Sequence, residues 1–260
     1  METLGADRPY TCERAPRPLA PIRDHIYSLH ALTRDHNLAA ATVPAEVGDW
    51  LILAAGLDGV SIITNGLGPG DDMCSNIYEE SRGPAAAAVA TELTRLLFIW
   101  GALQGLMRVK WGRKREQGQP RLLAQLVDQQ APPLLHQECA ARHLIESLRQ
   151  HSHESEFRVA LERAERFGGG IVGQSAFAAY QLRNSLAHGA VPWPDDNSIP
   201  SKPAVAIGST ACRVLTFAAQ SMLLNIVPPE CEVTNVVEDE WLEVPALDVL
   251  ATAQLRGPAW

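Results

Sequence analysis

An arginine and a histidine near the end of one predicted helix are the residues best suited to chemistry. Arg183, Asn184, His188 and Gly189 form the pattern Arg-Asn-x-x-x-His-Gly. An arginine is always charged and binds phosphate through two parallel hydrogen bonds. A histidine titrates near neutral pH and serves as general acid or base, and a helix C-terminus favours its protonated form. Such a pair suits RNA cleavage, in which the ribose 2′-hydroxyl supplies the nucleophile.

The helical spacing of the motif indicates that two chains build the site. At 100° per residue, Asn184 and His188 lie one turn apart on the same face, in line with Gln181. Arg183 lies about 140° around the helix from His188 and about 7.5 Å along its axis. We therefore expect a twofold-related copy to complete the site. The side facing the bundle is predicted to hold Ala178, Leu182 and Leu186. The alternative is that His188 merely interacts with the negative helix end.

Basic residues gather in one stretch of an acidic chain. The formal net charge is −8, yet residues 108–121 hold six basic residues and one acidic residue. Neutralised phosphates release counterions, so this run is predicted to bind an RNA backbone. The candidate residues are Arg108, Lys110, Arg113, Lys114 and Arg115. The alternative is a solvated loop between helices.

A metal site is a weaker possibility. His136, Cys139 and His143 have spacings that place them on one face of a helix, away from the apolar stripe and toward water. Zinc requires a fourth ligand, which His151 or His153 would have to supply from a non-standard spacing. We therefore expect no metal here, and interpret these residues as a polar helix face.

Composition limits the class of protein. The chain of 260 residues is 46% hydrophobic and 20% charged, which predicts a folded globule. The negative total excludes a surface that coats nucleic acid indiscriminately. Five scattered cysteines without a CxxC pair predict reduced thiols in a cytoplasm. The apolar stretch 96–107 is shorter than the roughly 20 residues of a membrane span, so no membrane is expected.

The elements that would position the motif are helices. Apolar periodicity, proline and glycine predict helices at 84–110, 122–128, 134–149 and 154–167, one ending at His188, and one at 204–226. The last is apolar or small nearly all round and is predicted to lie centrally. Residues 1–48 are expected to form loops with at most one short helix. Residues 50–56 suit a short helix, 59–64 a strand and 65–72 a turn.

These patterns predict a mainly α fold with an irregular or small α+β N-terminal segment. Three regions are expected: an N-terminal segment of unknown role at 1–80, a helical domain at 81–228 and an acidic C-terminal tail at 229–260. The tail carries six carboxylates and no basic residue between 230 and 243, which suggests a solvated edge.

The motif at Arg183, Asn184 and His188 resembles that of the HEPN superfamily, the higher eukaryotes and prokaryotes nucleotide-binding domains. The resemblance covers roughly residues 84–226 and implies a HEPN-like helical bundle. Many members are metal-independent ribonucleases that act as dimers in toxin–antitoxin and antiviral defence systems. The resemblance implies that Arg183 and His188 are catalytic and that Asn184 positions them. It also implies RNA, a second copy and an antitoxin or defence-system protein as partners, with no cofactor.

Two positions qualify this resemblance. Some families add an acidic residue from an earlier helix, and Glu92 is the counterpart here. Toxins controlled by a nucleotidyltransferase often carry tyrosine two places after the histidine, where this chain has Ala190. Control through such a tyrosine is therefore not expected. The alternative function is a HEPN-like module that binds nucleotides, RNA or a protein without catalysis.

Overall fold

Helices account for most of the structure. The computed structural model describes residues 17–41, 43–61, 83–113, 118–187, 202–237 and 240–255. These ranges hold ten helices and one antiparallel pair of strands, so the mainly α class is confirmed. The helices are α1 (Ile22–Arg34), α2 (His36–Ala41), α3 (Ala45–Gly56), α5 (Gly83–Trp111), α6 (Gln119–Asp128), α7 (Gln137–Gln150), α8 (Ser155–Phe167), α9 (Ile171–Ala187), α10 (Lys202–Ile226) and α11 (Ala246–Thr252). The strands are β1 (Glu232–Val237) and β2 (Glu240–Pro245).

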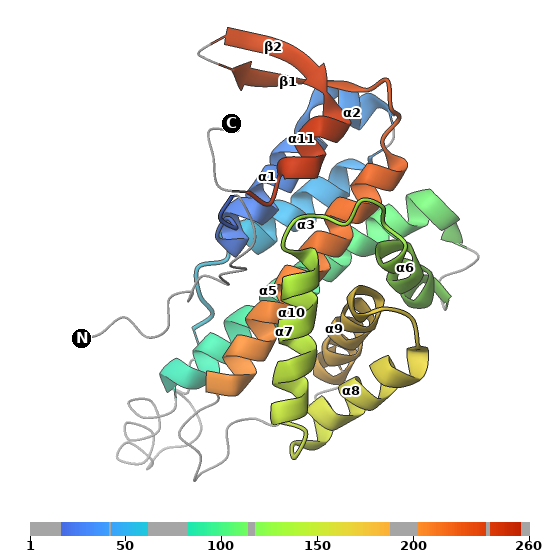
Figure 1. The fold of residues 1–260 in the computed structure, drawn as a ribbon. Coiled ribbons are helices and arrows are strands. Elements are labelled where there is room, and N and C mark those ends of the chain that lie inside the picture. The colour runs from blue at the N-terminus through green and yellow to red at the C-terminus, as the bar shows by residue number, and fades with distance from the viewer. Residues whose placement is uncertain are drawn as a thin grey trace.

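Helix α10 forms the centre of the bundle. Every side chain from Thr210 to Leu223 is buried. The helix packs along α5 and also contacts α7 and α9, and Figure 1 shows it crossing the middle of the molecule. A helix with small or apolar residues nearly all round needs neighbours on every side. The predicted central position of residues 204–226 is thus confirmed.

The N-terminal region is helical where loops were expected. Helices α1, α2 and α3 fill most of the described residues before position 57. Helix α1 buries Ile22, Ile26 and Leu29 along one side, the spacing of an amphipathic helix. Helix α3 contacts both α1 and α5. The pattern was missed because polar residues, among them His25 and Ser28, share the buried side with these apolar ones.

The strand expected at 59–64 does not form in its described part. Residues 59–61 have no regular secondary structure, and the N–H of Val60 donates to Thr91 Oγ1 of α5 at 2.9 Å. Residues 62–64 and the expected turn at 65–72 lie outside the described residues. The preceding short helix is confirmed, since α3 includes residues 50–56.

The acidic C-terminal region folds into a hairpin and a short helix. Strands β1 and β2 pair with Glu232 opposite Pro245, and α11 then buries Leu250. The N–H of Thr234 donates to Asp35 Oδ2 at 3.0 Å, which ties the hairpin to the N-terminal helices. Three of its carboxylates are exposed: Glu230, Glu232 and Glu243. The boundaries at 80 and 228 stay predictions, although one hydrophobic cluster includes buried residues from all three regions.

Helix α5 is longer than the apolar stretch considered in the sequence. Residues Ala86–Trp111 include an 18-residue window with a mean hydropathy of 1.4, which is enough to cross a membrane by length and composition alone. In the described structure α5 packs against both α3 and α10, and 44% of its most apolar window is buried. In this packing α5 contributes one side to the core of the helical bundle.

Candidate functional site

Helix α9 carries the predicted motif on its last turn. Arg183 and Asn184 belong to the helix, whereas His188 and Gly189 lie outside the described residues. Ala178 and Leu182 are buried against the bundle, as their spacing predicts. The side chain of Leu186, expected on the same side, is also outside the described part.

The start of α9 is fixed by a carboxylate from another helix. Asp128, the last residue of α6, accepts hydrogen bonds from the N–H groups of Gly170 at 2.7 Å and Gly173 at 3.0 Å. A negative charge at a helix N-terminus also interacts favourably with the helix dipole. Gly173 permits this approach, because a Cβ there would lie 2.8 Å from the carbonyl oxygen of Ala124. The anchor sets the position of α9, and hence of the motif, relative to α6.

Arg183 has an unusual set of contacts for a charged side chain. Its Nη1 donates to Asn184 Oδ1 at 3.1 Å, and its Cζ lies 5.9 Å from the centroid of the Trp100 ring. Its Nε is buried and has no hydrogen-bond partner among the described residues. No carboxylate in this part of the chain pairs with the guanidinium. The group keeps both its charge and unused donors, which is the state that favours an anionic ligand.

Asn184 contacts the arginine beside it. Its side-chain oxygen accepts the hydrogen bond from Arg183, so the amide orients the guanidinium. The role expected for Asn184 toward His188 lies outside the described residues. Both side chains are partly exposed, which leaves them accessible from solvent at the end of α9.

A second arginine approaches α9 from the neighbouring helix. Arg163 of α8 donates through Nη1 to Gln181 Oε1 at 2.7 Å. Gln181 is buried and lies one turn before Asn184 on nearly the same face of α9. Arg163 is exposed and has no carboxylate partner among the described residues. It was not a sequence candidate, because only the packing of α8 against α9 brings it near the motif.

The described part of the basic run lies away from Arg183. Arg108 and Lys110 belong to the last turn of α5, and Arg113 follows it. At 1.5 Å per residue, Arg108 begins about 12 Å further along α5 than Trp100, the residue under Arg183. Lys110 Nζ donates to the carbonyl of Asn225 at 2.9 Å, near the C-terminus of α10. This contact suits a cation at the negative end of a helix.

The remaining members of that run are Lys114 and Arg115, which lie outside the described residues. Binding of RNA by all five basic residues therefore stays a prediction. Within one chain, the described members do not converge on Arg183. Any shared contact with RNA would need a strand long enough to follow α5.

The polar helix face expected at His136, Cys139 and His143 forms only in part. His136 lies before α7 rather than on it, with a left-handed φ of 68°, and it is buried instead of facing water. Its Nε2 donates to the carbonyl of Arg17 at 2.8 Å, which ties the N-terminal segment to α7. Cys139 and His143 remain on α7 and are partly buried. Among the described residues no group of three or more potential ligands could hold a metal ion.

Glu92 has a clear packing role. It forms an ion pair with Arg95 within α5, and Arg95 also donates to the carbonyls of Leu57 at 2.8 Å and Ala54 at 3.3 Å. These bonds join α5 to the end of α3. The second oxygen of Glu92, Oε2, is buried without a hydrogen-bond partner. No contact between Glu92 and Arg183 is present.

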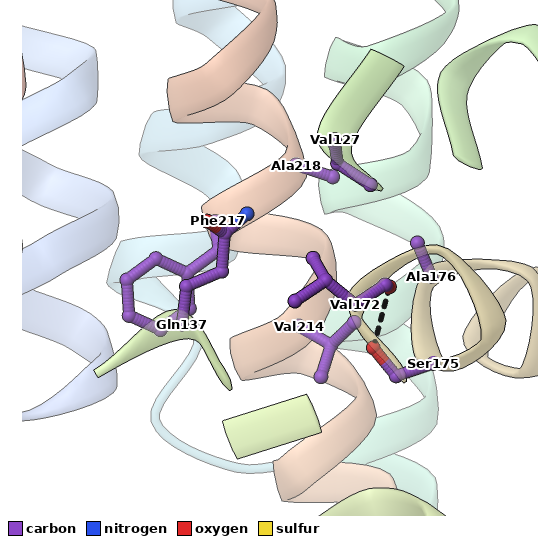
Figure 2. A pocket seen from close by; sticks show the side chains of 8 residues that line it. All are labelled: Val127, Gln137, Val172, Ser175, Ala176, Val214, Phe217 and Ala218. Carbon is purple, nitrogen blue, oxygen red and sulfur yellow. Dashed lines mark hydrogen bonds between the residues drawn. The ribbon is translucent and has the colours of Figure 1, made fainter. Parts of the chain in front are cut away.

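Two pockets lie near α9, and both are mainly apolar. One lies between the ends of α5, α8, α9 and α10, with Leu96, Phe157, Leu182 and Ile207 among its lining residues. Figure 2 shows the other, an internal space between α6, α7, α9 and α10. Its Ser175 hydroxyl donates to the carbonyl of Val172 at 2.8 Å and is therefore already used. Neither pocket offers charged groups to a phosphate.

Comparison of the chain with protein-family models, curated proteins and solved structures found no match.

Proposed function

We propose that this chain is a metal-independent endoribonuclease of the HEPN type. The observation that carries the proposal is the state of Arg183 at the end of α9. The guanidinium is bonded to a neutral amide, is not neutralised by any described carboxylate and retains a buried Nε without a partner. A phosphate diester would supply both the charge and the acceptors that this group lacks. His188 follows it in the sequence at the spacing of the motif.

The proposed reaction is an internal transesterification of RNA. The 2′-hydroxyl attacks the adjacent phosphorus, and the bond to the 5′-oxygen of the next nucleotide breaks. His188 transfers protons as general acid–base, while Arg183 stabilises the negative charge that develops on the phosphoryl oxygens. Asn184 holds the guanidinium in place through the bond at 3.1 Å. The products are a 2′,3′-cyclic phosphate and a 5′-hydroxyl.

A second copy of the chain completes the proposed site. The angular separation of Arg183 and His188 on one helix makes it difficult for both to reach one phosphate. A twofold axis near α9 would bring the arginine of one copy to the histidine of the other. We place the enzyme in the cytoplasm, in bacterial defence or toxin–antitoxin biology, with an antitoxin or defence-system protein as a further partner.

The test is cleavage of RNA by the purified full chain in the presence of a chelator. We expect Arg183→Ala and His188→Ala each to lower the cleavage rate by about 10²–10⁴-fold, the range for loss of a general acid–base or of a group that stabilises charge. Arg34→Ala is the matched control, because Arg34 is an exposed arginine of α1 that pairs with Asp49 of α3. It should cleave at the wild-type rate.

Two results would contradict this function. One is cleavage that persists undiminished in both Arg183→Ala and His188→Ala. The other is cleavage that the chelator abolishes and added Mg²⁺ restores. End-group analysis provides an independent check, since a metal-dependent hydrolase usually leaves no cyclic phosphate.

One observation favours the non-catalytic alternative, a binding module. Arg183 already stacks on Trp100 and binds Asn184, and the pocket beside it is apolar. In that case the same surface would bind RNA, a nucleotide or a protein without cutting. Tight RNA binding without cleavage by the wild-type chain would establish this alternative.

A further inference from the structure

Four aromatic rings form a continuous chain of contacts beside the motif. Trp100 of α5 lies 5.0 Å from Tyr180 of α9, measured between ring centroids. Tyr180 lies 5.8 Å from Phe177, which in turn lies 5.1 Å from Phe167 of α8. The chain of rings therefore runs from α5 across α9 to α8. Arg183 lies over the ring at its first end.

Tyr180 is the ring of this chain that solvent reaches next to the motif. Trp100 is only 2% exposed and Phe177 is 9% exposed, whereas Tyr180 is partly exposed. Tyr180 precedes Arg183 by three residues and Asn184 by four, so it neighbours both on the preceding turn of α9. A flat ring thus lies directly beside the guanidinium.

Helical spacing places one arginine on each side of Tyr180. Around α9, Arg183 lies about 60° to one side of Tyr180, and Gln181, which accepts the hydrogen bond from Arg163, lies about 100° to the other. Neither arginine pairs with a carboxylate among the described residues. An aromatic ring between two cations is the arrangement by which proteins hold single strands of nucleic acid, with bases on the ring and phosphates on the cations.

We propose that Tyr180 is a base-stacking residue and that the substrate is single-stranded RNA. This inference rests on the proposed function, because the phosphate beside the stacked base is the one that Arg183 contacts. One base stacks on the solvent-accessible part of the Tyr180 ring, and the strand continues toward Arg163. Duplex RNA is excluded as substrate, since a paired base cannot reach the ring.

The test measures binding separately from cleavage. The full chain carrying His188→Ala is mixed with single-stranded RNA oligonucleotides. Each oligonucleotide carries 2-aminopurine at one position, and this position differs from one oligonucleotide to the next. Stacking on Tyr180 quenches the fluorescence of the base at one or a few positions. Adding Tyr180→Leu removes this quenching and weakens binding by about 5- to 150-fold, the scale of one lost base–aromatic stack. Tyr180→Phe retains both, because the ring is kept.

Tyr27→Leu is the matched control. It removes a tyrosine ring that is 57% exposed on α1, outside the chain of rings, and should leave binding and quenching unchanged. Thermal unfolding of each variant identifies any that does not fold. If Tyr180→Leu does not fold, the quenching measured on the chain that keeps Tyr180 and on Tyr180→Phe still tests the stacking proposal.

The proposal is overturned if no position of the single strand is quenched, if duplex binds as tightly as single strand, or if folded Tyr180→Leu binds like its parent. These outcomes are distinct from failure of the proposed function. If the protein binds RNA and quenches the 2-aminopurine fluorescence but never cleaves RNA, the stacking site is supported and the ribonuclease function is contradicted. If the protein cleaves RNA without quenching this fluorescence, the ribonuclease function is supported and the stacking site is contradicted.

Discussion

Single polar residues hold the interior of this bundle together, and His25 is the clearest case. Its ring is fully buried, its Nε2 donates to Gln220 Oε1 at 2.8 Å, and Arg213 Nη1 lies 3.5 Å from its Nδ1. Gln220 in turn donates to Gln254 Oε1 at 2.6 Å and to the carbonyl of Leu250. A neutral imidazole thus links α1, α10 and the segment that ends α11.

Burial, and then the nearby charge of Arg213, lower the pKa of His25 to about 3. In the unfolded chain it would titrate at about 6.5. Between these two pH values the unfolded state binds the extra proton, so stability is complete above pH 6.5 and is lost as the pH falls toward 3. We expect the free energy of unfolding to fall between pH 6.5 and pH 5 by up to about 1.4 kcal/mol per unit.

Urea unfolding at several pH values measures this slope. His25→Gln should be less stable at neutral pH and should show a shallower slope below pH 6.5. His153→Gln, at an exposed histidine, should follow the wild type. An unchanged slope in His25→Gln would show that other groups cause the acid sensitivity.

At the scale of secondary-structure elements, the anchor between α6 and α9 is the contact most important to the motif. Asp128 supplies two hydrogen bonds and a favourable charge to the start of α9. We expect Asp128→Ala to lower the free energy of unfolding by about 1–2 kcal/mol, as for loss of a strong N-cap. Denaturant titration measures this change in the free energy of unfolding. Glu146→Ala, at an exposed carboxylate of α7, should change it by less than about 0.5 kcal/mol. Equal losses of unfolding free energy in Asp128→Ala and Glu146→Ala would contradict the role of Asp128 as an anchor of α9.

The elements also show what could be predicted from the sequence. Helices with clear stripes and stop residues, such as α8 before Gly168, were placed correctly, because local periodicity and glycine or proline define them. Helix α1 was missed because polar residues share its buried side: His25 and Thr33 point inward with Ile26. The spacing of Arg183 and Asn184 made them candidates, and their role stays a prediction. Arg163 and Tyr180 could not be candidates from the sequence, because only tertiary packing gives them their neighbours.

At the scale of the whole molecule, the C-terminal region is part of the folded unit. Leu250 is fully buried in the same hydrophobic cluster as residues of α1 and α5. We expect Leu250→Ala to destabilise the entire chain by about 2–5 kcal/mol, in a single unfolding transition. Leu242→Ala is the matched control, because Leu242 is 42% exposed on β2. Two separate transitions in the wild type, only one of them shifted by Leu250→Ala, would instead show an independent tail.

A small change in the direction of α9 at the Asp128 anchor becomes a larger displacement further along the helix. The carboxylate binds the helix at Gly170 and Gly173, and Arg183 lies about 15 Å further along at 1.5 Å per residue. A tilt of about 10° at the anchor would move Arg183 by about 2.6 Å over that length. Displacements of about 1 Å can lower a rate 10²-fold. The position of Arg183, the proposed phosphate-binding group at one end of α9, therefore depends on a carboxylate at the other.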